Sequence, residues 1–207
     1  MSESLGPGCV HLGVGNVHKV GSIGKAGFGW ETRIVDEKRE DVKQGEVGEL
    51  AVKGPAVMLE YYHDKKATAE VLGDGWLYTG DMAKEDEDGF IFLVDRKKDV
   101  IISGGENIYP VQIEDFIRTN EAVHDVAVIG MPDKRLGEVT LAIVELKKGY
   151  IMTEEEMNDF CHALPRYKRP HKVIFADIPR NPTGKIEKPK LRVMYGGNRL
   201  VEAQNQG

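Results

Sequence analysis

The chain has little of the chemistry that marks secreted, metal-binding or membrane proteins. It holds two cysteines in 207 residues, Cys9 and Cys161, without a CxxC spacing, which argues against a disulfide framework or a zinc site. No apolar run approaches the roughly 18 residues of a membrane span, and the first residues lack the basic start and apolar core of a signal peptide. The six histidines show no metal-ligand spacing, and no GxSxG motif is present. These absences predict a cytoplasmic protein without a transmembrane segment.

Excess positive charge is absent as well. The chain has 28 Lys and Arg against 34 Asp and Glu, a formal net charge of −6, so bulk binding to nucleic acid or to an anionic membrane is not expected. The local exception is a basic cluster of Arg166, Lys168, Arg169 and Lys172. It is either a solvated patch or a contact for phosphate groups. RNA binding is disfavoured because no aromatic stacking surface accompanies the cluster.

The glycine-rich residues 1–29 lack apolar periodicity and are predicted to be loop that lies on another surface. A phosphate-binding loop is disfavoured there, because no Gly-Lys-Ser/Thr follows and no strand precedes the glycines. The segment up to residue 95 predicts several short strands and a short helix that begins after Asp64. The strands are expected at 32–35, 47–52, 75–81 and 90–94.

The pattern changes after residue 100. A capping box, Thr153-Glu-Glu-Glu156, is followed by Met157, Phe160, Cys161 and Leu164 at i, i+3, i+4 and i+7, which predicts a helix. Further helices are expected from Pro110 and over 186–195, and strands over 100–102, 123–130, 141–146 and 172–176. The fold class is therefore α+β, with a β-rich part followed by a small mixed α+β domain.

Three side chains could carry chemistry, and each also has a structural explanation. Asp81 follows Thr79-Gly80 and could accept hydrogen bonds from vicinal hydroxyls such as those of a ribose, or it could serve a turn. Arg96 could bind ribose or phosphate oxygens in a fork, or belong to a solvated turn. Lys185, in Asn181-Pro-Thr-Gly-Lys185, could neutralise charge in a phosphoryl or acyl-phosphate transition state, or be an ordinary surface lysine.

Two backbone features are equally open. Gly104 and Gly105 remove side chains where a ligand could approach the backbone, or they form a tight turn between a strand and a helix. The charged residues 95–99 lie between two apolar runs and could be a surface turn or a hinge between domains.

The order of these motifs resembles the C-terminal part of the acyl-adenylate-forming superfamily, which contains acyl-CoA synthetases, peptide-synthetase adenylation domains and firefly luciferase. The resemblance rests on Tyr78-Thr-Gly-Asp81, on residues 95–114 and on Pro182-Thr-Gly-Lys185. The amino-acid sequence of residues 95–114 is most similar to that of fatty or aromatic acyl-CoA ligases. The resemblance implies a reaction in which a small-molecule carboxylic acid attacks the α-phosphate of ATP. The C-terminal domain then rotates, and the thiol of coenzyme A displaces AMP.

The resemblance also implies roles for individual residues. Asp81 would hold the ribose hydroxyls with Arg96 beside it, and Lys185 would bridge carboxylate and phosphate oxygens. Lys98 matches the hinge position. The remaining matches are Gly104 and Gly105 near pantetheine, Lys168 and Arg169 near CoA phosphates, Ser2 at an ATP phosphate and Glu3 at Mg²⁺.

On this resemblance, residues 1–95 would be the incomplete β-rich end of the large AMP-binding domain, 96–98 the hinge and 99–207 the small mobile domain. The family's Thr/Ser/Gly-rich phosphate loop and most of its acyl pocket are not found in this sequence. The chain is therefore expected to be a fragment, inactive alone, whose main physical partner is the absent N-terminal domain. Two alternatives stay open: an adenylation enzyme with a carrier-protein thiol as acceptor, and a non-catalytic binding module.

Overall fold

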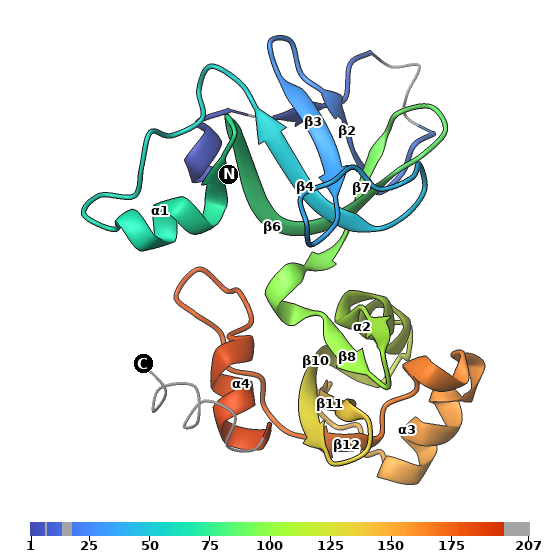
Figure 1. The fold of residues 1–207 in the computed structure, drawn as a ribbon. Helices are drawn as coiled ribbons and strands as arrows, with labels where there is room; N and C mark the ends of the chain where they lie inside the picture. The colour runs from blue at the N-terminus through green and yellow to red at the C-terminus, as the bar shows by residue number, and fades with distance from the viewer. Residues whose placement is uncertain (7, 14–17, 197–207) are drawn as a thin grey trace. The chain divides into compact units, whose positions relative to one another are not determined.

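A computed structural model describes residues 1–6, 8–13 and 18–196, which fall into two compact units, Met1–Lys98 and Asp99–Gly207. Each unit combines a sheet with short helices (Figure 1), so the predicted α+β class is confirmed. Within the described part of the chain, no helix is long and apolar enough to cross a membrane.

The first unit is built on a seven-stranded antiparallel sheet with the order β1-β2-β7-β6-β4-β3, to which β5 adds at β6. A short 3₁₀ turn, η1 (Ser2–Ser4), precedes the sheet, and helix α1 (Lys65–Val71) follows β4. The Asp64 side chain accepts a hydrogen bond from the Ala67 N–H and caps α1, as predicted. The strands are β1 (Cys9–Val10), β2 (Ser22–Ala26), β3 (Glu31–Val35), β4 (Gly48–Lys53), β5 (Leu72–Gly73), β6 (Trp76–Glu85) and β7 (Ile91–Arg96).

Strand β4 is buried over five of its six residues because apolar side chains cover both faces of the sheet around it. Successive side chains of a strand point to opposite faces. Leu50 and Val52 accordingly pack in the main core of the unit, whereas Ala51 packs with Val35 and Tyr78 on the other face. This rigid central pairing positions β6, which carries Asp81.

The prediction that residues 1–29 form only loop is wrong. Ser22–Ala26 is strand β2, which pairs with β7 on one side and with the short β1 on the other. Gly24 has φ +96°, and a Cβ added there would lie 2.1 Å from the Val10 carbonyl oxygen. Backbone pairing with distant strands, rather than an apolar pattern, forms β2, and glycine is what lets β1 approach it.

The second unit has a five-stranded sheet with the order β10-β11-β8-β9, and β12 pairs in parallel with β11. Its strands are β8 (Ile101–Ser103), β9 (Glu106–Ile108), β10 (Val123–Asp133), β11 (Gly137–Leu146) and β12 (Lys172–Phe175). Its helices are α2 (Pro110–Arg118), α3 (Glu154–Phe160) and α4 (Lys188–Tyr195), with 3₁₀ turns η4 (Cys161–Ala163) and η5 (Arg166–Lys168), and η3 (Lys97–Asp99) joins the two units.

The long hairpin of β10 and β11 is apolar on both faces, which makes the second unit three-layered. Val126 and Val128 of β10 join the core beneath α2 and α3, and Ala127 and Ile129 join the core beneath α4. Helices α2 and α3 therefore cover one face of the sheet and α4 covers the other (Figure 1). The predicted capping box at Thr153 is confirmed, with both of its reciprocal hydrogen bonds present.

The sequence pattern suggested that Gly104 and Gly105 form a turn between a strand and a helix. In the structure they form a two-residue hairpin turn between two strands. Both residues have positive φ, +59° and +88°, which is the requirement of a type I′ turn. The chain returns through β9, and α2 begins only at Pro110. The Gly104 N–H donates to the Leu136 carbonyl at 2.8 Å, so the turn is held against the hairpin of β10 and β11.

Candidate functional site

Asp81 and Arg96 lie directly opposite each other on the paired strands β6 and β7. The Arg96 Nε lies 2.9 Å from the Asp81 Oδ1. The Asp81 side chain keeps 27% exposure, and that of Arg96 is largely exposed. The pairing leaves carboxylate lone pairs and guanidinium N–H groups available to a ligand, so the two residues could together bind a polar group such as a diol.

A second charged pair supports the strand on which Asp81 sits. The buried Glu49 of β4 accepts a hydrogen bond from the Gly80 N–H at 2.9 Å and forms an ion pair with Lys97 at 2.7 Å. The Thr79 hydroxyl donates to the Leu50 carbonyl at 2.8 Å and accepts from the Asp81 N–H. The backbone around Asp81 is therefore fixed by its neighbours, which pre-organises the carboxylate.

Burial is the main influence on the charge of Asp81. Partial burial raises the pKa of the Asp81 carboxyl, while the Arg96 guanidinium opposes this effect and the nearby Glu3 and Glu49 carboxylates add to it. The net effect is a pKa above the ordinary value. A carboxyl with a raised pKa among other acids is typical of a binding or catalytic site.

Each residue of this pair lines a different cavity of the first unit. One has a volume of about 450 Å³ and a mainly charged and polar wall that includes Glu3, Tyr61, Thr79, Gly80 and Arg96. A smaller one of about 190 Å³ has a mainly apolar wall, of which Asp81 forms part. The ion pair therefore stands between a polar and an apolar compartment, an arrangement that suits a ligand with both characters.

Glu3 and Ser2 belong to the turn η1. The Glu3 carboxylate accepts a hydrogen bond from the Tyr61 hydroxyl at 3.1 Å, and the Glu3 carbonyl accepts from the Met58 N–H at 2.7 Å. These contacts hold Glu3 at the wall of the larger cavity, while the Ser2 side chain is exposed. Among the described residues, no group of three or more His, Cys, Asp or Glu could hold a metal ion.

Sequence reasoning did not identify Glu49, Lys97 and Tyr61 as parts of this site. Glu49 lies about 30 residues before Asp81 and reaches it only through the pairing of β4 with β6. The sequence pattern marked Lys97 only as one of the charged residues 95–99. An acidic residue inside the otherwise apolar strand pattern of 47–52 was the one available signal, because a buried carboxylate needs partners.

Lys185 lies in the second unit on a loop of residues 181–187, which we call the lysine loop. The Asn181 side-chain oxygen accepts hydrogen bonds from the Thr183 N–H and hydroxyl and from the Lys185 N–H, at 2.7–3.0 Å. The Asn181 N–H donates to the Lys185 carbonyl at 2.9 Å, which closes the loop. The Lys185 side chain is exposed, and its ammonium group makes no hydrogen bond or ion pair within the described chain.

Lys98 lies at the boundary of the two compact units, inside η3. The residues on either side of it are held: Lys97 pairs with Glu49 at 2.7 Å, and Asp99 pairs with Arg192 of α4 at 2.6 Å. The Lys98 side chain is exposed and has no polar partner among the residues that the structure describes.

The other predicted residues of the second unit differ in their availability. Gly104 and Gly105 are exposed at the tip of their hairpin. The Lys168 ammonium donates to the Gln112 side-chain oxygen at 2.6 Å. Arg169 donates to the carbonyls of Leu164 and His162 at 2.9 and 2.8 Å, so much of its guanidinium already serves the backbone.

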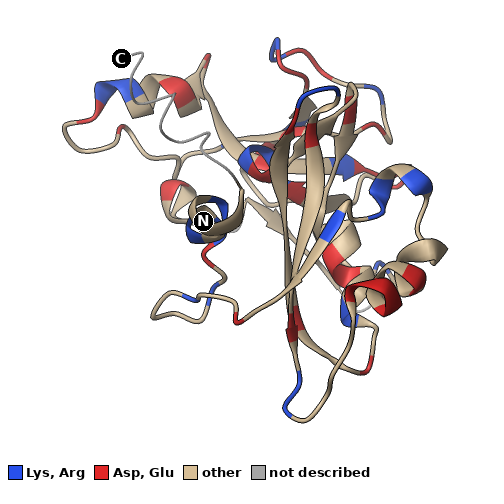
Figure 2. Ribbon diagram, turned by 90° about the horizontal axis from the view of Figure 1, so that it is seen from below, with Lys and Arg blue, Asp and Glu red and all other residues tan. Residues whose placement is uncertain are grey.

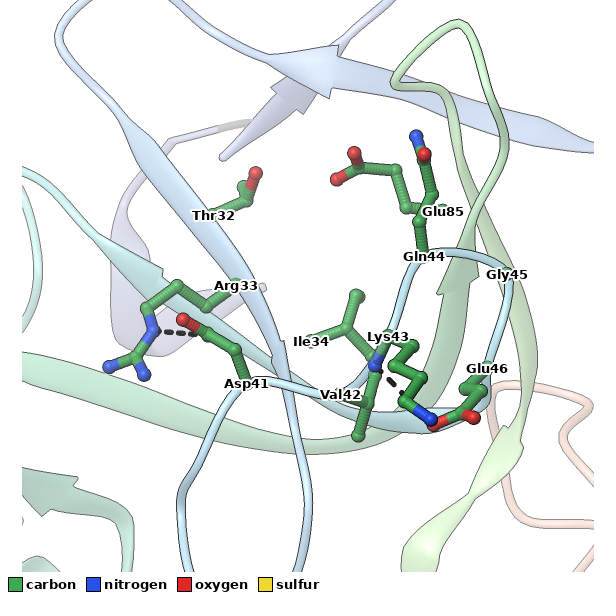
Figure 3. A pocket seen from close by; sticks show the side chains of 10 residues that line it. All are labelled: Thr32, Arg33, Ile34, Asp41, Val42, Lys43, Gln44, Gly45, Glu46 and Glu85. Atoms are coloured by element: carbon green, nitrogen blue, oxygen red, sulfur yellow. Dashed lines mark hydrogen bonds and ion pairs between the residues drawn. The ribbon is translucent and has the colours of Figure 1, made fainter.

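A third pocket, of about 250 Å³, lies between β3 and residues 41–46 and contains none of the predicted site residues (Figure 3). Its Arg33 and Asp41 side chains pair with each other at 2.6 Å, which leaves less of their charge to a ligand. Within the described chain, Figure 2 shows Lys and Arg interspersed with Asp and Glu along the ribbon. The Asp81–Arg96 pair is thus the better candidate site in the first unit.

Two protein-family models match parts of this chain. Residues 1–62 match the model of the AMP-binding enzymes, and residues 112–185 match the model of the AMP-binding enzyme C-terminal domain. The chain therefore belongs to the AMP-binding, adenylate-forming enzymes, and the family expected from the order of the motifs is confirmed.

Curated relatives within this family are CoA ligases. The chain is 42% identical over 182 residues to 2-succinylbenzoate–CoA ligase of Geobacillus sp. (strain WCH70), which covers 87% of this chain and 37% of that protein. It is 41% identical over 197 residues to long-chain-fatty-acid–CoA ligase FadD13 of Mycobacterium tuberculosis (strain CDC 1551 / Oshkosh), covering 94% and 39%. The chain thus spans less than two fifths of the length of these relatives.

A solved structure with the same fold carries the reaction intermediate. The o-succinylbenzoate CoA synthetase of Bacillus subtilis, in complex with its acyl-adenylate, is 35% identical to the chain with a TM-score of 0.85, and the match covers 93% of this chain and 40% of that one. A second structure of that protein holds ATP and a magnesium ion, with 35% identity, a TM-score of 0.83 and coverage of 93% and 40%.

Proposed function

We propose that this chain forms part of an AMP-forming acid–thiol ligase, which activates a small-molecule carboxylic acid with ATP and transfers the acyl group to coenzyme A. The observation that carries this proposal is the Asp81–Arg96 pair, fixed between a polar and an apolar cavity in an AMP-binding enzyme. The CoA-ligase names of the relatives support coenzyme A as the acceptor.

The reaction has two steps. A carboxylate oxygen of the acid attacks the α-phosphorus of ATP, the bond from that phosphorus to the bridging oxygen breaks, and pyrophosphate leaves. The CoA sulfur then attacks the acyl carbon of the acyl-AMP, AMP leaves with the electron pair of its acyl–oxygen bond, and the thiol proton passes to solvent. The protein must bind the nucleotide in both steps, but it must stabilise different charges in each.

The residues of the site divide these tasks. The Asp81 carboxylate accepts hydrogen bonds from the ribose hydroxyls, and Arg96 keeps that carboxylate ionised and adds donors of its own. The Lys185 ammonium, which has no polar partner within the described chain, neutralises the charge that builds up on the carboxylate and phosphate oxygens during the first step.

A single carboxylate fits the role proposed for Glu3 in magnesium binding. Mg²⁺ usually keeps several waters and binds one or two carboxylates together with substrate phosphates, not a cage of protein ligands. The Glu3 carboxylate is held by Tyr61 at the wall of the polar cavity, and the exposed Ser2 hydroxyl could contact a phosphate of ATP. Mg²⁺ would supply charge neutralisation for the departing pyrophosphate.

The hinge is proposed at Lys98, between residues 1–95 of the large domain and residues 99–207 of the small mobile domain. Two ion pairs support this position, because Glu49 holds Lys97 and Arg192 holds Asp99, each within its own unit. The two pairs tie the neighbours of Lys98 to different units, which favours Lys98 as the residue at which the backbone rotates. After rotation, the exposed glycines 104 and 105 would contact pantetheine, with Lys168 and Arg169 near the CoA phosphates.

The proposal is tested with the protein expressed from the native gene. We expect AMP and pyrophosphate release that requires ATP, Mg²⁺ and a carboxylic acid from a panel of aliphatic and aromatic acids, and thioester formation with CoA. Because the chain covers less than two fifths of its relatives, the 207-residue chain alone should form no thioester. If no acid leads to release of AMP, the result would favour a non-catalytic binding module. If a thioester forms only with a carrier protein, the acceptor is a carrier-protein thiol and not CoA.

The compartment is proposed to be the cytoplasm. Both cysteines are free thiols that are buried in the structure, which suits a reducing environment.

A further inference from the structure

The lysine loop is attached at both ends to a chain of alternating charges in the second unit. Arg180 immediately precedes the loop, and Lys188 immediately follows it. Arg180 forms an ion pair with Asp125 of β10, and Lys188 forms one with Glu114 of α2 at 2.7 Å. Two residues that are eight positions apart in the sequence are thus held by two separate carboxylates of the same core.

Arg118 joins the two carboxylates. Its Nε donates to the Asp125 Oδ1 at 3.0 Å, and its Nη2 lies 3.8 Å from the Glu114 Oε2. The order of charges is Lys188, Glu114, Arg118, Asp125, Arg180, with each anion placed between two cations. We call these five residues the anchoring network.

The carboxylates of the network are themselves fixed by the sheet. Glu114 keeps only 5% exposure and accepts a hydrogen bond from the Val128 N–H at 2.8 Å. Asp125 accepts a hydrogen bond from the Val126 N–H at 2.8 Å. Burial tends to raise the pKa of the Asp125 carboxyl, but the hydrogen bonds from Arg180, Val126 and Arg118 outweigh it and keep the pKa below its usual value. One attachment therefore ends on β10 at Asp125, and the other ends on Glu114 of α2, which is itself hydrogen-bonded to β10.

Arg180 also holds the loop itself. Besides its contact with Asp125, its Nη1 donates to the Gly184 carbonyl at 3.1 Å, one residue before Lys185. One guanidinium thus connects the β10 carboxylate to the backbone next to the lysine, a task that needs the planar fork of arginine. The Lys185 side chain is left unpaired by polar groups of the described chain, but its backbone is anchored.

We propose that the anchoring network positions Lys185 for the first half-reaction, with Arg180 as its main positioning residue. The inference rests on the role proposed above for Lys185. A flexible ammonium stabilises a transition state effectively only when its backbone is held in advance, because small displacements are costly in rate. Glu114, Arg118, Asp125 and Lys188 then act through Arg180 and the loop ends, without touching the substrate.

The test uses Arg180→Met, which removes both contacts, and Arg180→Lys, which keeps a cation for Asp125 but cannot span to Gly184. The control is Lys148→Met, which removes an exposed cation of the same unit that lies outside the anchoring network and the lysine loop. All are made in the protein expressed from the native gene. Acyl-AMP formation and thioester formation from supplied acyl-AMP are timed separately, together with thermal unfolding.

We expect Arg180→Met to slow acyl-AMP formation at least tenfold, to leave thioester formation within twofold, and Arg180→Lys to fall between the wild type and Arg180→Met. Lys148→Met should match the wild type in both steps. A parallel loss of both half-reactions with a lower melting temperature would show a merely structural role and overturn the proposal, as would an unchanged rate of acyl-AMP formation.

A second measurement needs no activity. Amide hydrogen exchange at Gly184 and Lys185 should be at least tenfold faster in Arg180→Met than in the wild type, because the loop loses its link to β10. If the wild-type protein activates no acid, the proposed function fails. The exchange rate then shows by itself whether the anchoring network holds the lysine loop. Unchanged exchange would overturn the anchoring proposal even in an active enzyme.

Discussion

Replacing Asp81 by Asn should weaken nucleotide binding while leaving the fold at least as stable. Asn keeps the shape of the side chain and one acceptor oxygen, but it removes the charge. A hydrogen bond to a charged group contributes about 1.5–3 kcal/mol, so the loss of one such contact with a ribose hydroxyl predicts an increase in the Kd for AMP of roughly 10- to 150-fold.

The expected effect on stability has the opposite sign. Because burial raises the pKa of Asp81 above its unfolded value, the folded state holds the proton more tightly than the unfolded state. The contribution of this group to stability is therefore largest below the ordinary pKa and falls as pH rises through the raised pKa. The ion pair with the largely exposed Arg96 returns only about 0–1 kcal/mol. Near neutral pH, Asp81→Asn should thus leave the melting temperature unchanged or raise it slightly.

Two measurements on the protein expressed from the native gene check this prediction. Calorimetric titration gives the Kd for AMP, and thermal unfolding between pH 4 and 8 gives the stability difference. Asp88→Asn is the matched control, since its carboxylate is 66% exposed in a turn and pairs with Lys19 away from the site. An unchanged Kd, or a marked loss of stability at neutral pH, would refute the reasoning.

Three further outcomes are expected. Lys98→Pro restricts φ at the proposed hinge and should spare one half-reaction while slowing the other at least tenfold in separate single-turnover assays. If both half-reactions keep the same rate relative to wild type, residues 95–99 are a surface turn and not a hinge. Thr153→Ala removes the cap of α3 and should cost about 0.5–2 kcal/mol in urea unfolding, whereas Thr153→Ser should cost less. Burial raises the pKa of Cys9 and Cys161 to about 11, so neither thiol should react with a disulfide reagent at pH 8 until denaturant is added; rapid labelling of the native protein would contradict this burial.

Local patterns predicted the elements whose signals lie within the sequence. The helix after the capping box at Thr153 and the helix after Asp64 were found because their caps are side-chain features of adjacent residues. Strand β2 was missed because Ser22–Ala26 has a single large apolar residue and owes its form to pairing with β7. Strand β9 was missed because two adjacent glycines permit a hairpin as readily as a loop before a helix.

The candidate site also combines residues with a local sequence signal and residues that only long-range strand pairing brings in. Motif order predicted roles for Asp81, Arg96 and Lys185, and the structure brings the first two into contact across β6 and β7. Sequence spacing could not show the support that Glu49 gives through β4, since the register of two strands is set by packing in three dimensions. The ten residues proposed for ATP, Mg²⁺, CoA, catalysis and the hinge stay predictions until they are tested.

The two ion pairs that flank Lys98 also mark a natural crossover point for recombination. Glu49 and Lys97 belong to the first unit, and Asp99 and Arg192 belong to the second. If everything after Lys98 is exchanged for the matching segment of a related ligase, the Glu49–Lys97 pair stays intact. The residues at positions 99 and 192 then both come from the same donor protein. A crossover a few residues later would instead separate Asp99 from Arg192 and leave a nearly buried carboxylate dependent on a foreign partner. Chimaeras joined at Lys98 should therefore retain native packing in both halves more often than chimaeras joined within residues 100–110.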